Sequence, residues 1–293
     1  MSGKLYIVAT PIGNLGDMTP RAIEILREVD IIAAEDTQTS MALLTKFEIK
    51  TRLVSNHKFN ENNSADYFIT ELLGGKNIAL ISDAGTPCIS DPGSILVKRA
   101  AENNIDVLAI PGACATAAAI SISAFDIKSF IFEGFFPREN TEVKRIIKKL
   151  KENQGVYIFY ESPKRIIKTF EVFAEKLPDA NICLCNDLTK KFERVYRGSP
   201  VEILEELRDN PSAEKGEYTV VVEISDVEIT RDAEDCVPYE NLSIESIIVD
   251  VMIKQKCTVK DAVKYIASDG DYGFSKNEVY AASLNLKKMF TNN

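Results

Sequence analysis

The stretch LYIVATPIGNLGDMTP, residues 5–20, decides the fold of the first part of this 293-residue chain. Its apolar start, Leu5 to Ala9, is typical of a buried strand. Thr19 followed by Pro20 is typical of the N-cap and first residue of a helix. The loop between them, TPIGNLGD at 10–17, therefore joins a strand to a helix, which is where α/β proteins commonly bind ligands.

This loop lacks the pattern of a phosphate cradle. A P-loop requires GxxxxGK followed by Ser or Thr, and a dinucleotide fingerprint requires GxGxxG. The loop has only Gly13 and Gly16, and Pro11 has no N–H to donate. Glu35 and Asp36 end the next apolar run, where a ribose-binding carboxylate would lie, so a dinucleotide site stays open as an alternative.

Short apolar runs alternate with segments of helical periodicity through the first 125 residues. The expected strands are 5–9, 30–34, 52–55, 77–82 and 106–110. The expected helices are near 20–29, 39–47, 63–74, 92–103 and 113–124. Because a helix follows each strand, the connections are crossovers and the sheet is mostly parallel. The loops after the carboxyl ends of its strands are then the expected ligand site.

Three of these loops combine glycine, proline and small residues. They are TPIGNLGD at 10–17, DAGTPCISDPG at 83–93 and PGACA at 111–115. Glycine permits a ligand to approach the backbone closely, and proline fixes the shape of the loop. Ordinary turn chemistry explains any one of them, but three at equivalent ends of one sheet indicate a shared binding site.

The alternation repeats from about residue 126. Strand-like runs occur at 130–135, 156–160, 193–197 and 218–224, with helices near 141–153 and 201–209. After residue 226 the chain turns acidic, and helical patterns follow near 242–254, 259–267 and 275–289. The sequence thus predicts one α/β domain over 1–125 and a second over 126–226, with a ligand cleft between them, and a linker with a small helical domain over 227–293.

A net charge of −9 disfavours a nucleic-acid binder, but the charge is unevenly distributed. Residues 138–197 carry 14 basic and 9 acidic side chains, against 11 and 16 in residues 1–137 and 10 and 19 in residues 198–293. The candidate RNA-binding residues in this segment are Lys144, Arg145, Lys148, Lys149, Lys164 and Arg165. A solvated helix face explains such a run, and so does a polyanionic partner.

The chain contains no apolar stretch near the roughly 20 residues that cross a bilayer, and its N-terminus lacks the order of a signal peptide. We therefore expect a cytoplasmic protein. Its six cysteines, at 88, 114, 183, 185, 236 and 257, lie mostly in apolar runs, as reduced core thiols do. Cys183 and Cys185 share one face of an expected strand, but no second ligand pair accompanies them, so no metal is predicted.

Seven motifs follow one another along residues 4–224: TPIGNLGD, AAEDT at 33–37, ISDAGTPCISDPG at 81–93, PGA at 111–113, YESP at 160–163, LTK at 188–190 and KGE at 215–217. Together they resemble the tetrapyrrole methylase superfamily, and within it the enzymes that methylate the 2′-oxygen of a cytidine in the decoding region of bacterial 16S rRNA. The tail resembles the small C-terminal helical domain of those enzymes.

The resemblance implies a two-domain homodimer that binds S-adenosylmethionine, folded, in its cleft and modifies 16S rRNA of the small ribosomal subunit. No metal or nucleotide cofactor is implied. By position in the motifs, the residues implied to line the methyl-donor site are Pro11, Asp83, Ala84, Gly85, Thr86, Pro111, Gly112 and Ala113.

Methyl transfer from a sulfonium is an in-line displacement, so positioning supplies much of the catalysis. A base or a cation near the ribose hydroxyl would add to it. The candidates are His57, the only histidine; Glu35 and Asp36, whose alternative role is helix capping; and Lys190. Phe59, Lys164 and Phe192 stand where relatives often have histidine, which weakens any mechanism that depends on those positions.

Two other functions remain open at this point. A related enzyme could methylate a tetrapyrrole or another small molecule with the same donor loops, and a non-catalytic protein could bind RNA with the same basic segment. The extended cationic segment 138–197 favours RNA over a small acidic macrocycle. Binding of S-adenosylmethionine would distinguish an enzyme from a passive RNA-binding protein.

Overall fold

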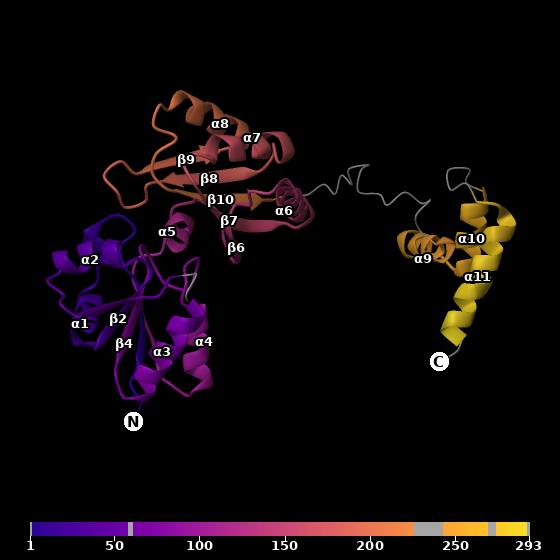
Figure 1. The fold of residues 1–293 in the computed structure, drawn as a ribbon. Coiled ribbons are helices and arrows are strands. Elements are labelled where there is room, and N and C mark those ends of the chain that lie inside the picture. Colours follow the sequence, from indigo (N-terminus) through magenta and orange to yellow (C-terminus); the bar gives the residue numbers. More distant parts are fainter. Residues whose placement is uncertain (1, 58–60, 226–242, 269–273, 292–293) are drawn as a thin grey trace. The chain divides into compact units, whose positions relative to one another are not determined.

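The structure, a computed structural model of the chain, describes residues 2–57, 61–225, 243–268 and 274–291. Two compact units make up the chain, Met1–Val227 and Glu228–Asn293 (Figure 1). The first part of the predicted linker and helical domain, residues 227–242 with Cys236, lies outside the described ranges, as does Phe59.

The first sheet of the larger unit is entirely parallel. Its strands are β1 (Leu5–Val8), β2 (Ile31–Ala34), β3 (Arg52–Ser55), β4 (Ile78–Ile81) and β5 (Val107–Ile110). Their order is β3-β2-β4-β1-β5, and every pairing is parallel, which confirms the predicted mostly parallel sheet. All residues of β2 and β4 are buried, as expected of strands covered on both faces.

Helices cover both faces of this sheet (Figure 1). They are α1 (Pro20–Glu28), α2 (Thr37–Lys46), α3 (Glu61–Leu73), α4 (Ser94–Glu102) and α5 (Ala115–Ser121). Leu5, Ile31 and Leu80 pack with Phe68 of α3 and Leu96 of α4. On the other face, Val8, Ile32 and Ile81 pack with Leu26 of α1 and Leu44 of α2. Successive side chains of each strand point to opposite faces of the sheet, so the same strands contribute to two separate cores.

The start of α1 follows the expected capping chemistry. The Thr19 side chain accepts a hydrogen bond from the Ala22 N–H at 3.2 Å, and Pro20 occupies the first helical turn. Pro20 has no N–H to leave unpaired there. The helix begins at the residue that the sequence predicts.

The second sheet of the larger unit is mixed. Its strands are β6 (Phe130–Phe135), β7 (Gly155–Glu161), β8 (Asn181–Asn186), β9 (Arg194–Gly198) and β10 (Tyr218–Ile224), in the order β6-β7-β10-β8-β9. Only β6 and β7 run parallel to each other in this sheet. Helices α6 (Asn140–Glu152), α7 (Ile166–Lys176) and α8 (Pro200–Asp209) bury one face around Leu150, Phe159, Phe173 and Leu207.

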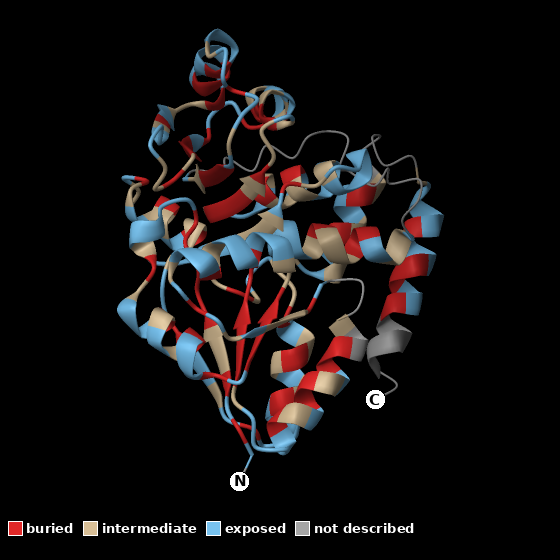
Figure 2. Cartoon of the chain, turned by 60° about the vertical axis from the view of Figure 1, so that its left-hand side comes forward, coloured by how far each residue is buried: buried red, intermediate tan, exposed pale blue. Residues whose placement is uncertain are grey.

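The opposite face of the second sheet packs on α5, which lies between the two sheets (Figure 1). Ala119 of α5 is buried against Ile158 of β7 and Val221 of β10, and Ile12 from the first loop joins the same cluster. Figure 2 shows buried residues concentrated in the strands and on one side of the helices. Helix α5 thus connects the two sheets through small side chains.

The smaller unit consists, in its described part, of α9 (Ile244–Gln255), α10 (Val259–Ser268) and α11 (Lys276–Thr291). Ile247, Val251, Ile266 and Val279 form its core. These helices agree with the predicted helical tail. Among the described residues, no helix is long and apolar enough to cross a membrane.

Candidate functional site

The three loops rich in glycine and proline meet because the strands before them are neighbours. Strands β4, β1 and β5 are consecutive in the first sheet and parallel. The Thr10 N–H donates to the Gly85 carbonyl at 2.8 Å, and the Gly85 N–H donates to the Thr10 carbonyl at 3.1 Å. The Thr86 hydroxyl donates to the Ala113 carbonyl at 3.0 Å. These bonds join the loops into one continuous surface.

Two glycines are required by the shape of this surface. Gly85 has φ of +84°, and a Cβ added there would lie 3.2 Å from Cγ2 of Ile12. A Cβ added to Gly112 would lie 2.9 Å from Cβ of Ala9. Positive φ and close backbone approach are the two conditions that favour glycine. Both loops therefore hold conformations that larger residues would disturb.

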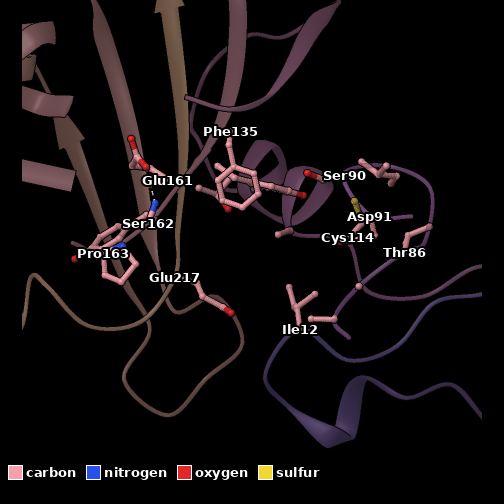
Figure 3. Close-up of a pocket in the computed structure, with 17 residues that line it drawn as sticks. Ile12, Thr86, Ser90, Asp91, Cys114, Phe135, Glu161, Ser162, Pro163 and Glu217 are labelled. Carbon is pink, nitrogen blue, oxygen red and sulfur yellow. Dashed lines mark hydrogen bonds between the residues drawn. The ribbon is translucent and has the colours of Figure 1, made fainter. Parts of the chain in front are cut away.

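A cavity of about 340 Å³ lies between these loops and the second sheet. Figure 3 shows Ile12, Thr86, Asp91 and Cys114 on one side and Phe135, Glu161, Ser162 and Pro163 on the other. Tyr160, Glu217, Tyr218 and Thr219 also line it from the second sheet. A largely apolar wall with a few polar groups is typical of small-molecule sites. The predicted cleft between the two sheets is present.

A second cavity, of about 270 Å³, adjoins the first. The two share Ile12, Ala84 and Glu217. Pro11, Gly13 and Asp83 line the second cavity from the first sheet, and Lys190 lines it from the loop after β8. The TPIGNLGD loop thus separates two spaces, with Ile12 facing both.

Acidic side chains gather where β2 and β4 end. Burial raises the pKa of Glu35, and the nearby charges of Asp91 and Asp83 raise it further. Burial likewise raises the pKa of Asp83, with the charge of Asp36 adding to the effect, and the pKa of Asp91, with the charge of Asp83 adding to it. The charged neighbours responsible for these shifts are other carboxylates. The wall of the site is therefore suited to a ligand that carries positive charge.

The geometry fits the family that the chain matches. The model of Tetrapyrrole (Corrin/Porphyrin) Methylases matches residues 4–203. The chain belongs to the tetrapyrrole methylase family. It is 41% identical to Ribosomal RNA small subunit methyltransferase I of Bacillus subtilis (strain 168), over 96% of this chain and 94% of that protein. It is 38% identical to the protein of the same name from Haemophilus influenzae, over 97% of each.

Solved structures show the same tetrapyrrole methylase fold at much lower identity. Diphthine synthase aligns with a TM-score of 0.59 at 16% identity, covering 75% of this chain and 90% of that one. At this identity the likeness concerns the fold alone.

The donor-site residues implied by the tetrapyrrole methylase motifs divide between the two cavities. Ala84, Gly85 and Thr86 line the larger one, and Pro11, Asp83 and Ala84 line the smaller one. Ala113 is tied to Thr86, whereas Pro111 and Gly112 lie on the surface beside Ala9. From the third loop it is Cys114 and Ala115 that enter the larger cavity.

The four candidate catalytic residues lie in different settings. Asp36 is the N-cap of α2, since its carboxylate accepts from the Gln38 and Thr39 N–H groups at 2.7 and 3.2 Å. For Asp36 the structure therefore shows helix capping, the alternative role considered from the sequence. His57 is exposed at the end of β3, an edge strand that β2 separates from β4. Lys190 lines the smaller cavity, whereas Glu35 lines neither cavity and interacts electrostatically with the lining residues Asp83 and Asp91.

Lys190 is held by two carboxylates. Its ammonium group lies 2.8 Å from Oδ1 of Asp187 and 2.9 Å from Oε2 of Glu217. Burial lowers the pKa of Lys190, but the hydrogen bonds to Asp187 and Glu217 outweigh it, so the pKa is raised overall. A lysine held in its charged form can stabilise negative charge but is a poor proton acceptor.

The candidate RNA-binding residues differ in how freely they face solvent. On α6, Lys149 pairs with Glu133 at 2.5 Å and Arg145 with Glu142 at 3.7 Å, while Lys144 is exposed. Lys148 lies 3.8 Å from Glu152, and Lys164 is exposed. The predicted basic face of α6 therefore alternates with acidic partners.

Arg165, the sixth candidate, is part of the interior framework. It donates to the carbonyls of Phe136 and Pro137 at 3.1 and 2.7 Å and pairs with the buried Glu161 at 3.3 Å. The Glu161 carboxylate also accepts from the Ser162 N–H and the Thr169 hydroxyl. Arg165 thus holds the YESP turn that lines the larger cavity.

The sequence alone does not single out several residues of the cavity wall. Ile12, Cys114, Phe135 and Tyr160 line the larger cavity but are absent from the predicted site residues. Each lies at or just beyond the carboxyl end of a strand or at the start of a helix, a signal that the sequence contains. No group of three or more His, Cys, Asp or Glu residues in the described ranges is placed to hold a metal ion.

Proposed function

We propose that this protein transfers a methyl group from S-adenosylmethionine to the ribose 2′-oxygen of cytidine 1402 in 16S rRNA. The observation that carries the proposal is the cavity built by three hydrogen-bonded loops, in a chain that aligns over nearly its whole length with proteins named Ribosomal RNA small subunit methyltransferase I.

The residues around the cavities fit S-adenosylmethionine. Gly85 leaves a close backbone surface for the ligand, and the apolar wall around Ile12 suits an adenine ring and a thioether chain. Asp83 suits the positive charge of the donor, because a cation offsets the repulsion between this carboxylate and Asp36. When bound, the donor supplies an activated methyl group with a neutral sulfur leaving group.

The chain contributes chiefly by holding donor and acceptor in line. A rigid wall made from two sheets restricts the orientation of both reactants, which is the main source of rate in a displacement of this kind. Among the four candidates, we assign proton acceptance to Glu35, because burial and the charges of Asp91 and Asp83 raise its pKa and so make its carboxylate a stronger base. Lys190 would stabilise negative charge on the acceptor strand.

The partners follow from the surfaces of the larger unit. Lys144, Lys148 and Lys164 would contact phosphates of the RNA. The edge strands β5 and β6 expose Leu108, Phe130 and Ile131, which we assign to the interface of a homodimer in the cytoplasm. Sedimentation of the purified protein as a monomer at micromolar concentration would contradict the dimer.

The function is tested with small ribosomal subunits from a strain that lacks the modification. We expect the protein to transfer labelled methyl from S-adenosylmethionine to these subunits or to their RNA. Mass spectrometry of nuclease fragments then maps the label. Label on a base carbon or nitrogen would contradict 2′-oxygen chemistry, and failure to bind the donor in calorimetry would contradict an enzymatic role altogether.

A further inference from the structure

Phe135 is an aromatic residue that the fold leaves exposed at a cavity wall. It is 59% exposed, yet it lines the larger cavity opposite the donor loops (Figure 3). The next residue, Phe136, is almost fully buried in the core of the second sheet. The chain therefore divides two adjacent phenylalanines between the interior and the site.

The backbone before Phe135 is shaped to present this ring. The pairing of β6 with β7 shifts register between Phe132 and Phe135, which marks an irregularity of the bulge type. Gly134, inside the shift, has φ of +74°, and a Cβ added there would meet nothing within 4 Å. Glycine is thus needed for the backbone conformation and not for space. Bulges next to active sites commonly re-aim a side chain.

The ring is held by an aromatic neighbour rather than by burial. The Phe135 and Tyr160 rings lie 5.7 Å apart at 73°, and the Phe132 and Tyr160 rings lie 4.9 Å apart at 63°. The Tyr160 hydroxyl shares a hydrogen bond of 2.9 Å with the hydroxyl of Thr116 on α5. Tyr160 is therefore fixed, and its edge-to-face contact with Phe135 leaves much of the latter's ring exposed.

An exposed, braced aromatic ring at a ligand cavity matches a flat ligand. We propose that Phe135 is the platform on which the nucleobase of the target ribonucleotide stacks. The inference rests on the proposed function, in which an unstacked nucleotide of the RNA enters the cavity with its ribose toward the donor. Unstacked RNA bases are commonly received by Phe or Tyr side chains.

The chemistry across the cavity agrees with a base that carries an amino group. Asp91 lines the wall opposite Phe135 (Figure 3), and a carboxylate accepts hydrogen bonds from the exocyclic amine of cytosine. A base stacked on Phe135 would face this wall edge-on. Phe135 and Asp91 would together select the acceptor nucleotide, whereas the backbone of the three glycine-rich loops would hold the donor.

The test compares Phe135→Leu, which keeps an apolar side chain but removes the aromatic face, with Phe135→Tyr, which keeps the face. Phe192→Leu is the matched control, since Phe192 is 72% exposed and lies in the turn after β8. We expect Phe135→Leu to raise KM for small ribosomal subunits about fivefold or more, the range of one lost base stack. Phe135→Tyr and Phe192→Leu should stay near wild type, and donor affinity should be unchanged in all three.

Each contrary result has a different meaning. An unchanged KM in Phe135→Leu, with wild-type protein active on the same subunits, overturns base stacking and leaves the proposed function intact. A parallel loss of donor affinity in calorimetry assigns the ring to the adenine of the donor and also overturns the inference. Absence of methyl transfer by the wild-type protein overturns both proposals.

A second measurement observes the target base directly. The fluorescence of a short single-stranded RNA that carries pyrrolocytidine at the target position reports stacking of that base. We expect the wild-type protein with S-adenosylhomocysteine to quench this fluorescence. Quenching that is equal for wild type and Phe135→Leu, or absent for wild type, contradicts the assignment.

Discussion

The side chain of Lys190 packs directly over Gly13, so the loop after β8 contacts the first glycine-rich loop. A Cβ at position 13 would clash with the aliphatic part of that lysine. The charged end continues to Asp187 and Glu217. The LTK and TPIGNLGD motifs, about 175 residues apart in the chain, are therefore one structural feature.

Replacing Lys190 with Met tests what its charge contributes. The aliphatic packing on Gly13 is kept, but Asp187 and Glu217 are left facing each other. Because the site is partly exposed, we expect a loss of about 1 kcal/mol, which lowers the melting temperature by about 2–4 °C. The control is Lys191→Met, at the next position, which is exposed, and we expect it to leave the melting temperature unchanged. Equal melting temperatures for both variants would argue against the ion pairs.

Replacing Gly85 with Ala tests the loop surface. Alanine at φ of +84° is strained by about 1–2 kcal/mol, and its Cβ would press on Ile12. We expect affinity for S-adenosylmethionine, measured by calorimetry, to fall about tenfold or more. Gly74→Ala, at the end of α3, is the control and should bind normally. Wild-type affinity in Gly85→Ala would place the donor elsewhere.

Replacing Glu35 with Gln tests the acidic cluster through pH. The folded pKa of Glu35 is raised by burial and by Asp91 and Asp83, so its ionised form destabilises the fold. Its contribution to stability is present below the ordinary pKa and is lost as pH rises through the folded value. Glutamine does not ionise, so the Gln variant does not lose this stability. Its melting temperature should exceed that of wild type at pH 8 and match it near pH 4.

The control for this pH series has the opposite sign. The Glu202 carboxylate accepts from the Ser199 N–H and hydroxyl, and these hydrogen bonds hold its pKa below the ordinary value. Its contribution is therefore present above the ordinary pKa and is lost as pH falls. Glu202→Gln should be less stable than wild type at pH 8. Destabilisation of Glu35→Gln at pH 8 would mean that its hydrogen bonding outweighs its burial.

Changing Lys148 and Lys149 together to Glu tests the basic helix α6. We expect KM for small ribosomal subunits to rise at least about tenfold at low salt, with a shallower salt dependence and unchanged donor affinity. A double variant of Lys46 and Lys98, exposed lysines on α2 and α4, makes the same change of net charge elsewhere. An equal effect of both double variants would indicate net charge alone and not a local RNA contact.

Local chemistry made much of the fold predictable. The Thr19-Pro20 pair predicts the start of α1, and the alternation of apolar runs with helices predicts parallel strands. The order of those strands is not local information. Only the placement of β1 between β4 and β5 explains why the 10–17, 83–93 and 111–115 loops touch.

The candidate site was less predictable for the same physical reason. Whether Arg165 faces RNA or the carbonyls of Phe136 and Pro137 depends on how a strand and a distant helix pack, and a run of basic residues does not contain that information. The role of Phe135 depends on a register shift that neighbouring strands determine. The partners of Lys190 come from two loops that meet only in the folded chain.

Helix α5 affects the width of the larger cavity and therefore the size of the ligands that can enter it. Its sequence ATAAAIS gives Ala115 to the wall of the larger cavity and buries Ala119 against the second sheet. The methyl groups of these alanines therefore set the distance between the glycine-rich loops and the side chains of Phe135 and Tyr160. The width of the larger cavity therefore depends on the buried face of α5, and one added methylene at Ala119 would widen or tilt the whole opening.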